Sequence, residues 1–140
     1  MYQGLQHAHS FIAYAALILL IVASINAIIG LTSNKEFTAK DRKISLFGLI
    51  FTHIQLLIGI ILYFASDKVQ PFSIAMKNPE LRLYALEHPL INIIAVILIT
   101  VGFSKHKKAT TNNAKFKSIA VMYTIGLLLI LSRIPWNAWF

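Results

Sequence analysis

The sequence predicts an all-helical membrane protein: a bundle of four transmembrane helices with its N- and C-termini on the same, outer side. Hydrophobic residues make up 57% of the 140 residues and charged residues only 13%, which is about half the charged share of a soluble domain. The charges cluster in short stretches, and four nearly continuous apolar segments lie between them. Each segment has about the 20 residues that a helix needs to cross the hydrocarbon core of a bilayer.

The four segments are expected to form a single transmembrane domain, residues 1–140, with spans at about 11–31, 44–65, 83–103 and 116–134. Helix is the expected conformation because backbone groups in lipid must be hydrogen-bonded internally, and four long spans are too few for a barrel. The start, MYQGLQHAHS, has no Lys or Arg, so we interpret the first apolar segment as a retained span and not as a signal peptide. The absence of cysteine excludes disulfides, iron–sulfur clusters and covalently attached haem.

The distribution of Lys and Arg predicts the orientation in the membrane. Loop 32–43 contains four such residues and loop 104–117 contains five, against four on the opposite side. The positive-inside rule makes these two loops cytoplasmic in a bacterial inner membrane and leaves both termini outside. Trp136 and Trp139 would anchor the outer interface, and residues 66–82 would form a short cover over it. The excess of 13 Lys and Arg over 5 Asp and Glu is thus attributed to topology, and no nucleic-acid partner is expected.

Polar side chains within a span are costly and mark candidate functional sites. The candidates are His9, His53, Gln55, His88, Asn92 and Arg133, with Glu87 at the entrance of the third span. By contrast, His106 lies in a lysine-rich loop and is expected to be solvated.

The first two spans each show a stripe of small residues on one face. The first stripe follows 4-3 spacing and comprises His9, Ala13, Ala16, Leu20, Ala23, Ala27 and Gly30. It fits close helix packing, and it also fits a space beside His9 for a bulky cofactor. The second stripe comprises Gly48, Thr52, Gln55 and Gly59, and His53 lies roughly 140° away from it on the helix.

Depth along the helices guides the choice of a ligand pair. Counted from the cytoplasmic ends at about 1.5 Å per residue, His53 lies roughly 12 Å deep, His88 roughly 23 Å, Arg133 roughly 25 Å and His9 roughly 33 Å. No two histidines match in depth, and this disfavours one small metal bound by three histidines. His53 and His88 could still hold a b-type haem between them, with Arg133 paired to its propionates. His9 with His88 is the alternative pair.

The chain resembles small four-helix bacterial membrane proteins described as cytochrome b-like. The resemblance covers nearly the whole length and rests on LQHAHSF, FTHIQLLIGIILYF, EHPLINIIAVILITVG and SRIPW. It implies haem binding and electron transfer, with recurring positions at His9, His53, Glu87, His88 and residues 134–136. Ala13 and Tyr14 stand where that family often has an arginine flanked by aromatic residues, so a propionate role passes to Arg133.

The leading functional hypothesis is therefore an electron carrier with one or two haem b groups. The carrier would be linked to quinol and to a redox membrane complex, and it is favoured over a stand-alone enzyme. His53 and His88 would ligate the iron, while Gln55 and Asn92 would tune the pocket through hydrogen bonds. Two alternatives stay open. One is a structural or accessory subunit of a larger membrane complex, with polar residues joining helices. The other is a small proton-relay or transport protein that uses His53 and Glu87. Homo-oligomerisation is also open.

Overall fold

The computed structural model describes residues 2–65, 71, 74 and 76–134. In chain order its elements are α1 (Tyr2–Thr32), α2 (Ala39–Ala65), α4 (Pro79–Arg82), the π-helical segment η1 (Leu83–Glu87), α5 (His88–Lys108) and α6 (Asn112–Ser132). No strand occurs among the described residues. The four predicted spans are confirmed as helices, although α1 and α2 extend well beyond the expected boundaries.

Four helical stretches of the described chain are long and apolar enough to cross a membrane, and α4, η1 and α5 together form the third. Their outward faces carry large apolar side chains, among them Phe11 at 73% and Leu128 at 61% exposure. Such continuous apolar surface is unusual on a soluble monomer and suits contact with acyl chains. The structure thus supports a multi-pass membrane protein.

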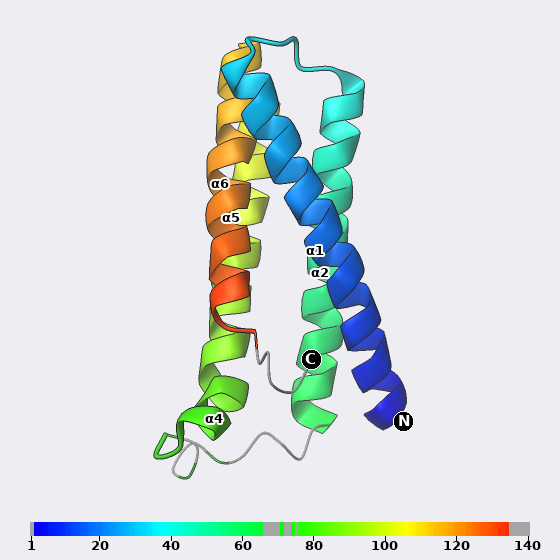
Figure 1. Cartoon of the computed structure of the whole chain (residues 1–140), viewed down its shortest axis with the longest axis vertical. Coiled ribbons are helices and arrows are strands. Elements are labelled where there is room, and N and C mark those ends of the chain that lie inside the picture. The colour runs from blue at the N-terminus through cyan, green and yellow to red at the C-terminus, as the bar shows by residue number, and fades with distance from the viewer. Residues whose placement is uncertain (1, 66–70, 72–73, 75, 135–140) are drawn as a thin grey trace.

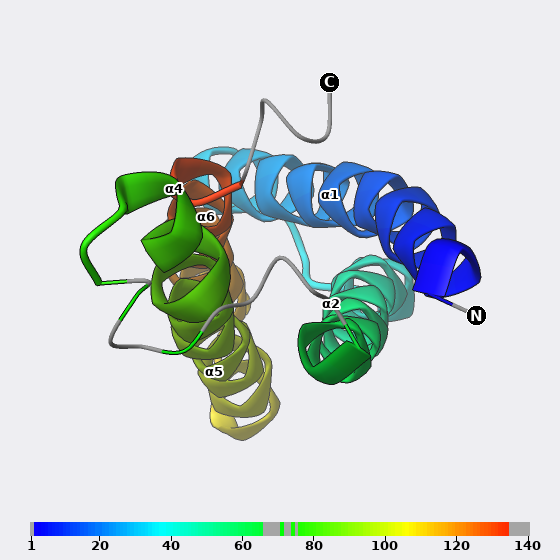
Figure 2. The same ribbon diagram turned by 90° about the horizontal axis from the view of Figure 1, so that it is seen from below.

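Two helix pairs, α1 with α2 and α5 with α6, form the bundle (Figure 1). Helix α1 runs obliquely, so that its start lies beside α2 and its end lies beside α6 (Figure 1). Seen from the end where α1 begins, α2 stands apart from α5 (Figure 2). The start of α1 and the end of α6 lie at one end of the bundle, and the two basic loops lie at the other.

Which side of a membrane each end faces stays a prediction of the charge pattern. The anchor at Trp136 and Trp139 lies outside the described residues, as do residues 66–70, 72–73 and 75 of the loop expected to cover the outer surface.

The hydrophobic core lies in the half of the bundle near the basic loops. It comprises Leu20, Ala23, Ala27, Ile99, Phe103, Phe116, Ile119, Ala120 and Tyr123. The Tyr123 hydroxyl, fully buried, donates a hydrogen bond of 2.8 Å to the Ser45 carbonyl. The inward stripe predicted for the first span is confirmed, because its members from Ala16 to Gly30 are all buried.

His106 is buried at 2% exposure, contrary to the expected solvated position. Its ring packs 4.5 Å from the Phe103 ring and 5.3 Å from the Phe37 ring, centre to centre. The helix continues five residues past Phe103, to Lys108 in the basic segment, and this extra turn carries His106 inward. The prediction was wrong because it ended the third span too early.

Asp41 is a buried carboxylate that ties the first loop to two helices. One of its oxygens accepts hydrogen bonds from the Thr38 amide and hydroxyl, both at 2.9 Å. The other accepts from the Asn26 side-chain amide at 3.0 Å and lies 3.5 Å from the Lys35 ammonium. Thr38 and Asp41 thereby cap the start of α2.

We expect Asp41→Ala to lower the free energy of unfolding by about 1–3 kcal/mol, because it leaves buried donors without an acceptor. Lys35→Ala is the matched control, since its side chain is half exposed and exposed ion pairs contribute less than about 1 kcal/mol. Unfolding of both variants in detergent, followed by circular dichroism, measures the difference. Equal losses for the two variants would contradict this account of Asp41.

Candidate functional site: a histidine-lined pocket

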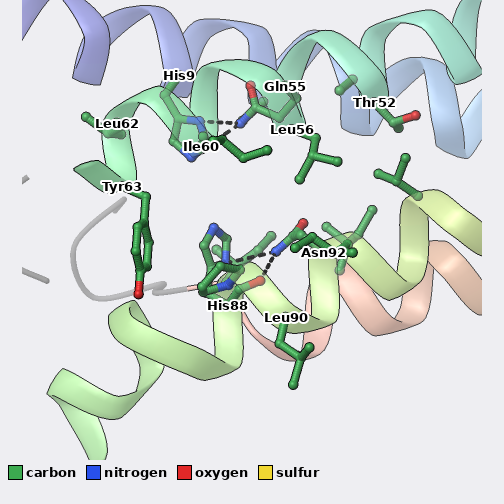
Figure 3. Close-up of a pocket in the computed structure, with 18 of the residues that line it drawn as sticks. His9, Thr52, Gln55, Leu56, Ile60, Leu62, Tyr63, His88, Leu90 and Asn92 are labelled. Carbon is green, nitrogen blue, oxygen red and sulfur yellow. Dashed lines mark hydrogen bonds between the residues drawn. The ribbon is translucent and has the colours of Figure 1, made fainter. Parts of the chain in front are cut away.

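A pocket of about 470 Å³ lies between the helices in the half of the bundle opposite the core (Figure 3). Most of its lining is apolar, and none of its described lining residues is charged. Its polar side chains are Gln6, His9, Ser10, Thr52, Gln55, Tyr63, His88 and Asn92. A concave apolar site with a few convergent polar groups is the usual form of a ligand pocket, and this volume lies within the common range of about 300–1,000 Å³.

Small residues and helix tilt create the space. Ala13 and Ala16 line the pocket from α1, and Gly59 lines it from α2. A Cβ on Gly59 would meet the His9 ring at 3.4 Å, so the glycine lets α1 and α2 approach beside that histidine. The expectation that small residues leave a space next to His9 is therefore met.

His9 and His88 face each other across this pocket, from α1 and α5 (Figure 3). Their ring centres are 6.3 Å apart and the ring planes are inclined at 89°. This corrects the depth estimate, which separated the two residues by roughly 10 Å. The estimate counted His88 from residue 103, whereas α5 continues five residues further to Lys108, which adds about 7.5 Å. It also treated the helices as parallel, whereas α1 crosses the bundle obliquely (Figure 1).

The hydrogen bonds of His88 determine its tautomer. Nδ1 lies 2.8 Å from the backbone carbonyl oxygen of Arg133. A carbonyl only accepts, so this shorter contact assigns the proton to Nδ1. The Asn92 amide nitrogen, 3.2 Å from Nδ1, then has no acceptor there. In the neutral ring, the lone pair is then on Nε2. The Asn92 side-chain amide donates to the His88 carbonyl at 2.5 Å and supports the same turn of α5.

The partner of His9 is Gln55, whose Nε2 lies 2.9 Å from His9 Nδ1. The other amide atom of Gln55, Oε1, is buried and has no hydrogen-bond partner among the described residues. Half a rotation of the carboxamide exchanges the two atoms, so that Oε1 accepts a proton from His9 Nδ1. His9 then has the same tautomer as His88, with the lone pair on Nε2.

This arrangement is the one that metal-ligating histidines adopt, with one ring nitrogen hydrogen-bonded and the other free for the metal. Two imidazoles that share a metal at about 2 Å per bond place their ring centres roughly 6 Å apart. The observed 6.3 Å fits that requirement.

The described residues contain no group of three or more His, Asp or Glu placed to hold a metal ion. A bare zinc ion in a protein takes three or four side-chain ligands, so two histidines are too few for it. A haem brings its own four nitrogens, and its iron needs only axial ligands from the protein. Of the metal groups considered, haem is the one that this pair of residues fits.

The structure does not bring His53 into the pocket lining. Its Nδ1 donates to the Leu49 carbonyl at 2.8 Å, and its Nε2 lies 3.3 Å from the Thr100 hydroxyl on α5. His53 therefore joins two helices through Thr100, whereas its expected partner, His88, is directed towards His9. Of the two pairs predicted from the sequence, the alternative pair is the one that the pocket unites.

Glu87 and Arg133 also lie differently from their expected roles. Glu87 forms an ion pair of 3.1 Å with Arg82 and is not part of the pocket lining. The Arg133 guanidinium donates to the Ser132 carbonyl at 2.9 Å, so the contribution of Arg133 to the site is its backbone oxygen. That contribution cannot be seen in a sequence, because it is independent of the side chain.

Tyr63 is a pocket residue that the sequence reasoning missed. It lines the side next to η1, and its hydroxyl donates to the Ala85 carbonyl at 2.8 Å. Tyr63 follows Gln55 and Gly59 at intervals of four residues, so extending the second stripe by one turn would have included it.

No protein-family model matches the chain, and no curated protein or solved structure is detectably similar to it. The argument for a function therefore depends on the pocket itself.

Proposed function

We propose that the protein binds haem b between His9 and His88 and transfers electrons within the membrane. The observation that carries the proposal is the pair of facing imidazoles, 6.3 Å apart, in an uncharged and mostly apolar pocket. Each Nδ1 has a hydrogen-bond partner. With the Gln55 carboxamide turned so that its oxygen accepts from His9 Nδ1, both Nε2 lone pairs are available to one iron atom, although the Gln55 amide also lies 3.4 Å from His9 Nε2. An iron atom between the two rings would accept both lone pairs.

Haem iron with two axial histidines supplies a one-electron redox couple. If both histidines bound the iron, the protein would leave no coordination position for a substrate, and this favours an electron carrier over an enzyme. The chain's own residues hold the ring nitrogens in place and exclude water. Gln55 orients His9, while the Arg133 carbonyl orients His88.

The propionates need a different partner from the one that the sequence suggested, because the pocket has no cationic lining residue. Gln6 and Ser10 are lining residues from the first three turns of α1, at the end of the bundle. We assign the propionates to this end, where carboxylates can reach the polar interface instead of being buried without a cation.

The proposal is tested by expressing the chain with a haem precursor and recording absorption spectra of the detergent-purified protein, oxidised and reduced. We expect a Soret band, a sharp α-band on reduction, and about one haem per chain, since one histidine pair lines the pocket. Purified protein that shows no Soret band, and that does not bind added haemin, would overturn it.

We expect Gln55→Leu to weaken haem binding by about 10–100-fold, the usual cost of losing a hydrogen-bond partner of a metal-ligating histidine. The control is Thr52→Val, because Thr52 also lines the pocket but donates only to the Leu49 carbonyl of its own helix. Haemin titration followed at the Soret band compares the two variants. If both bind haemin as the parent does, Gln55 does not position His9.

A further inference from the structure

The pocket reaches the outer surface of the bundle along the seam between α2 and α5. Four of its lining residues are large, apolar and exposed, namely Ile60 at 42%, Phe64 at 83%, Leu90 at 47% and Ile93 at 40%. Two belong to α2 and two to α5, so they occupy both sides of the seam. We call these four residues the α2–α5 window. In a membrane they meet acyl chains and not water.

Two hydrogen bonds cross the seam near the ends of the window, and Phe64 lies one residue beyond the first of them. Towards the chain termini, the Tyr63 hydroxyl bonds to the Ala85 carbonyl. Towards the basic loops, His53 meets the Thr100 hydroxyl. These are the hydrogen bonds that join α2 to η1 or α5 in the part of the chain that the structure describes. The two hydrogen bonds lie ten positions apart on α2, or about 15 Å of helix, and the α2 side chains between them are apolar except for Gln55.

Two other seams of the bundle contain closer helix contacts. A Cβ on Gly48 of α2 would lie at an ordinary contact distance, 3.6 Å, from the Leu19 carbonyl oxygen of α1. On the α5–α6 side, a Cβ on Gly126 would lie only 3.2 Å from the Ala95 carbonyl oxygen. Helices α5 and α6 therefore leave no passage between them at this level.

We propose that the pocket exchanges its ligand with the bilayer sideways through the α2–α5 window. This inference rests on the proposed function for the identity of the ligand, haem. The route suits a flat, mainly apolar molecule dissolved in the membrane, because every side chain of the window is a hydrocarbon. Tyr63 and His53 limit the opening at its two ends.

The absence of cysteine from the chain allows a direct test. Ile60→Cys and Ile93→Cys place one thiol on each side of the window. Bis-maleimides of increasing length are tried, and the shortest one that joins the two thiols is used to bridge the seam. Peptide mass spectrometry verifies the cross-link. The matched control is the same double variant treated with N-ethylmaleimide, which adds bulk without a bridge. Haemin is then supplied in liposomes, and its uptake is followed at the Soret band.

We expect bridging before haemin is added to slow uptake at least tenfold relative to the control. Bridging after loading should slow haem release to apomyoglobin by a similar factor. Equal rates in bridged and control protein would overturn the sideways route. A parent protein that binds no haemin at all would instead overturn the proposed function. In that case a second measurement, made without haem, tests whether the pocket opens sideways to the bilayer.

That second measurement places a bimane probe inside the pocket, on Leu56→Cys, in liposomes without haemin. Leu56 lines the pocket from α2, while a probe on the lipid-facing Leu128→Cys serves as reference. We expect lipids with brominated acyl chains to quench the two probes to within about twofold of each other, and aqueous iodide to quench neither. Strong iodide quenching at Leu56 with little bromine quenching would show access from water and overturn the route.

Discussion

We expect His88→Ala to abolish the Soret band of the purified protein and His9→Ala to do the same. Either change leaves the iron with one axial histidine in a pocket that offers no other ring nitrogen within its described lining. Loss of a ligand is more severe than loss of its hydrogen-bond partner, so haem content should fall below about one-tenth of the parent value. Haem per chain, measured as the pyridine haemochrome, provides the comparison.

His53→Ala is the matched control for this experiment, because it removes a histidine that bonds to Thr100 outside the pocket lining. Its haem content should stay close to that of the parent. The opposite pattern, with haem lost in His53→Ala and retained in His9→Ala, would restore the His53–His88 pair. Circular dichroism of all three variants checks that the helices are intact.

Gly30→Ala should lower the free energy of unfolding by about 1–3 kcal/mol. A Cβ at this position would lie 2.3–2.6 Å from three atoms of the Phe116 ring. That ring is fully buried and packs against Phe37 with 4.9 Å between ring centres, so it has little room to move. Helix α1 would have to separate from α6.

Gly4→Ala is the control, because a Cβ there meets nothing within 4 Å and alanine favours helix over glycine by about 0.5–1 kcal/mol. Thermal unfolding in detergent should therefore show a lower midpoint for Gly30→Ala and an unchanged or higher one for Gly4→Ala. Adding Phe116→Leu should recover part of the loss if the ring is its cause. A Gly30→Ala variant as stable as the parent would contradict the tight contact.

The sequence by itself determined the helices and their inward faces. Hydropathy over about 20 residues is a local property, and the 3.6-residue period placed His9, Ala16 and Ala23 on one stripe without knowledge of any neighbour. The same period placed Gln55 and Gly59 together. The pocket-forming faces of α1 and α2 could therefore be predicted before any fold was known.

Only the tertiary structure decided which histidines meet. The depth of His9 relative to His88 depends on where α5 ends, at Lys108, and on the tilt of α1, which is set by packing against neighbours and not by the residues of the helix alone. His53 was expected in the pocket although it lies roughly 140° from the Gln55 and Gly59 face of its helix, and it contacts Thr100 instead. The Arg133 carbonyl reaches His88 through the position of the backbone at the end of α6. A sequence records side chains and their spacing, but it does not record where two helices cross.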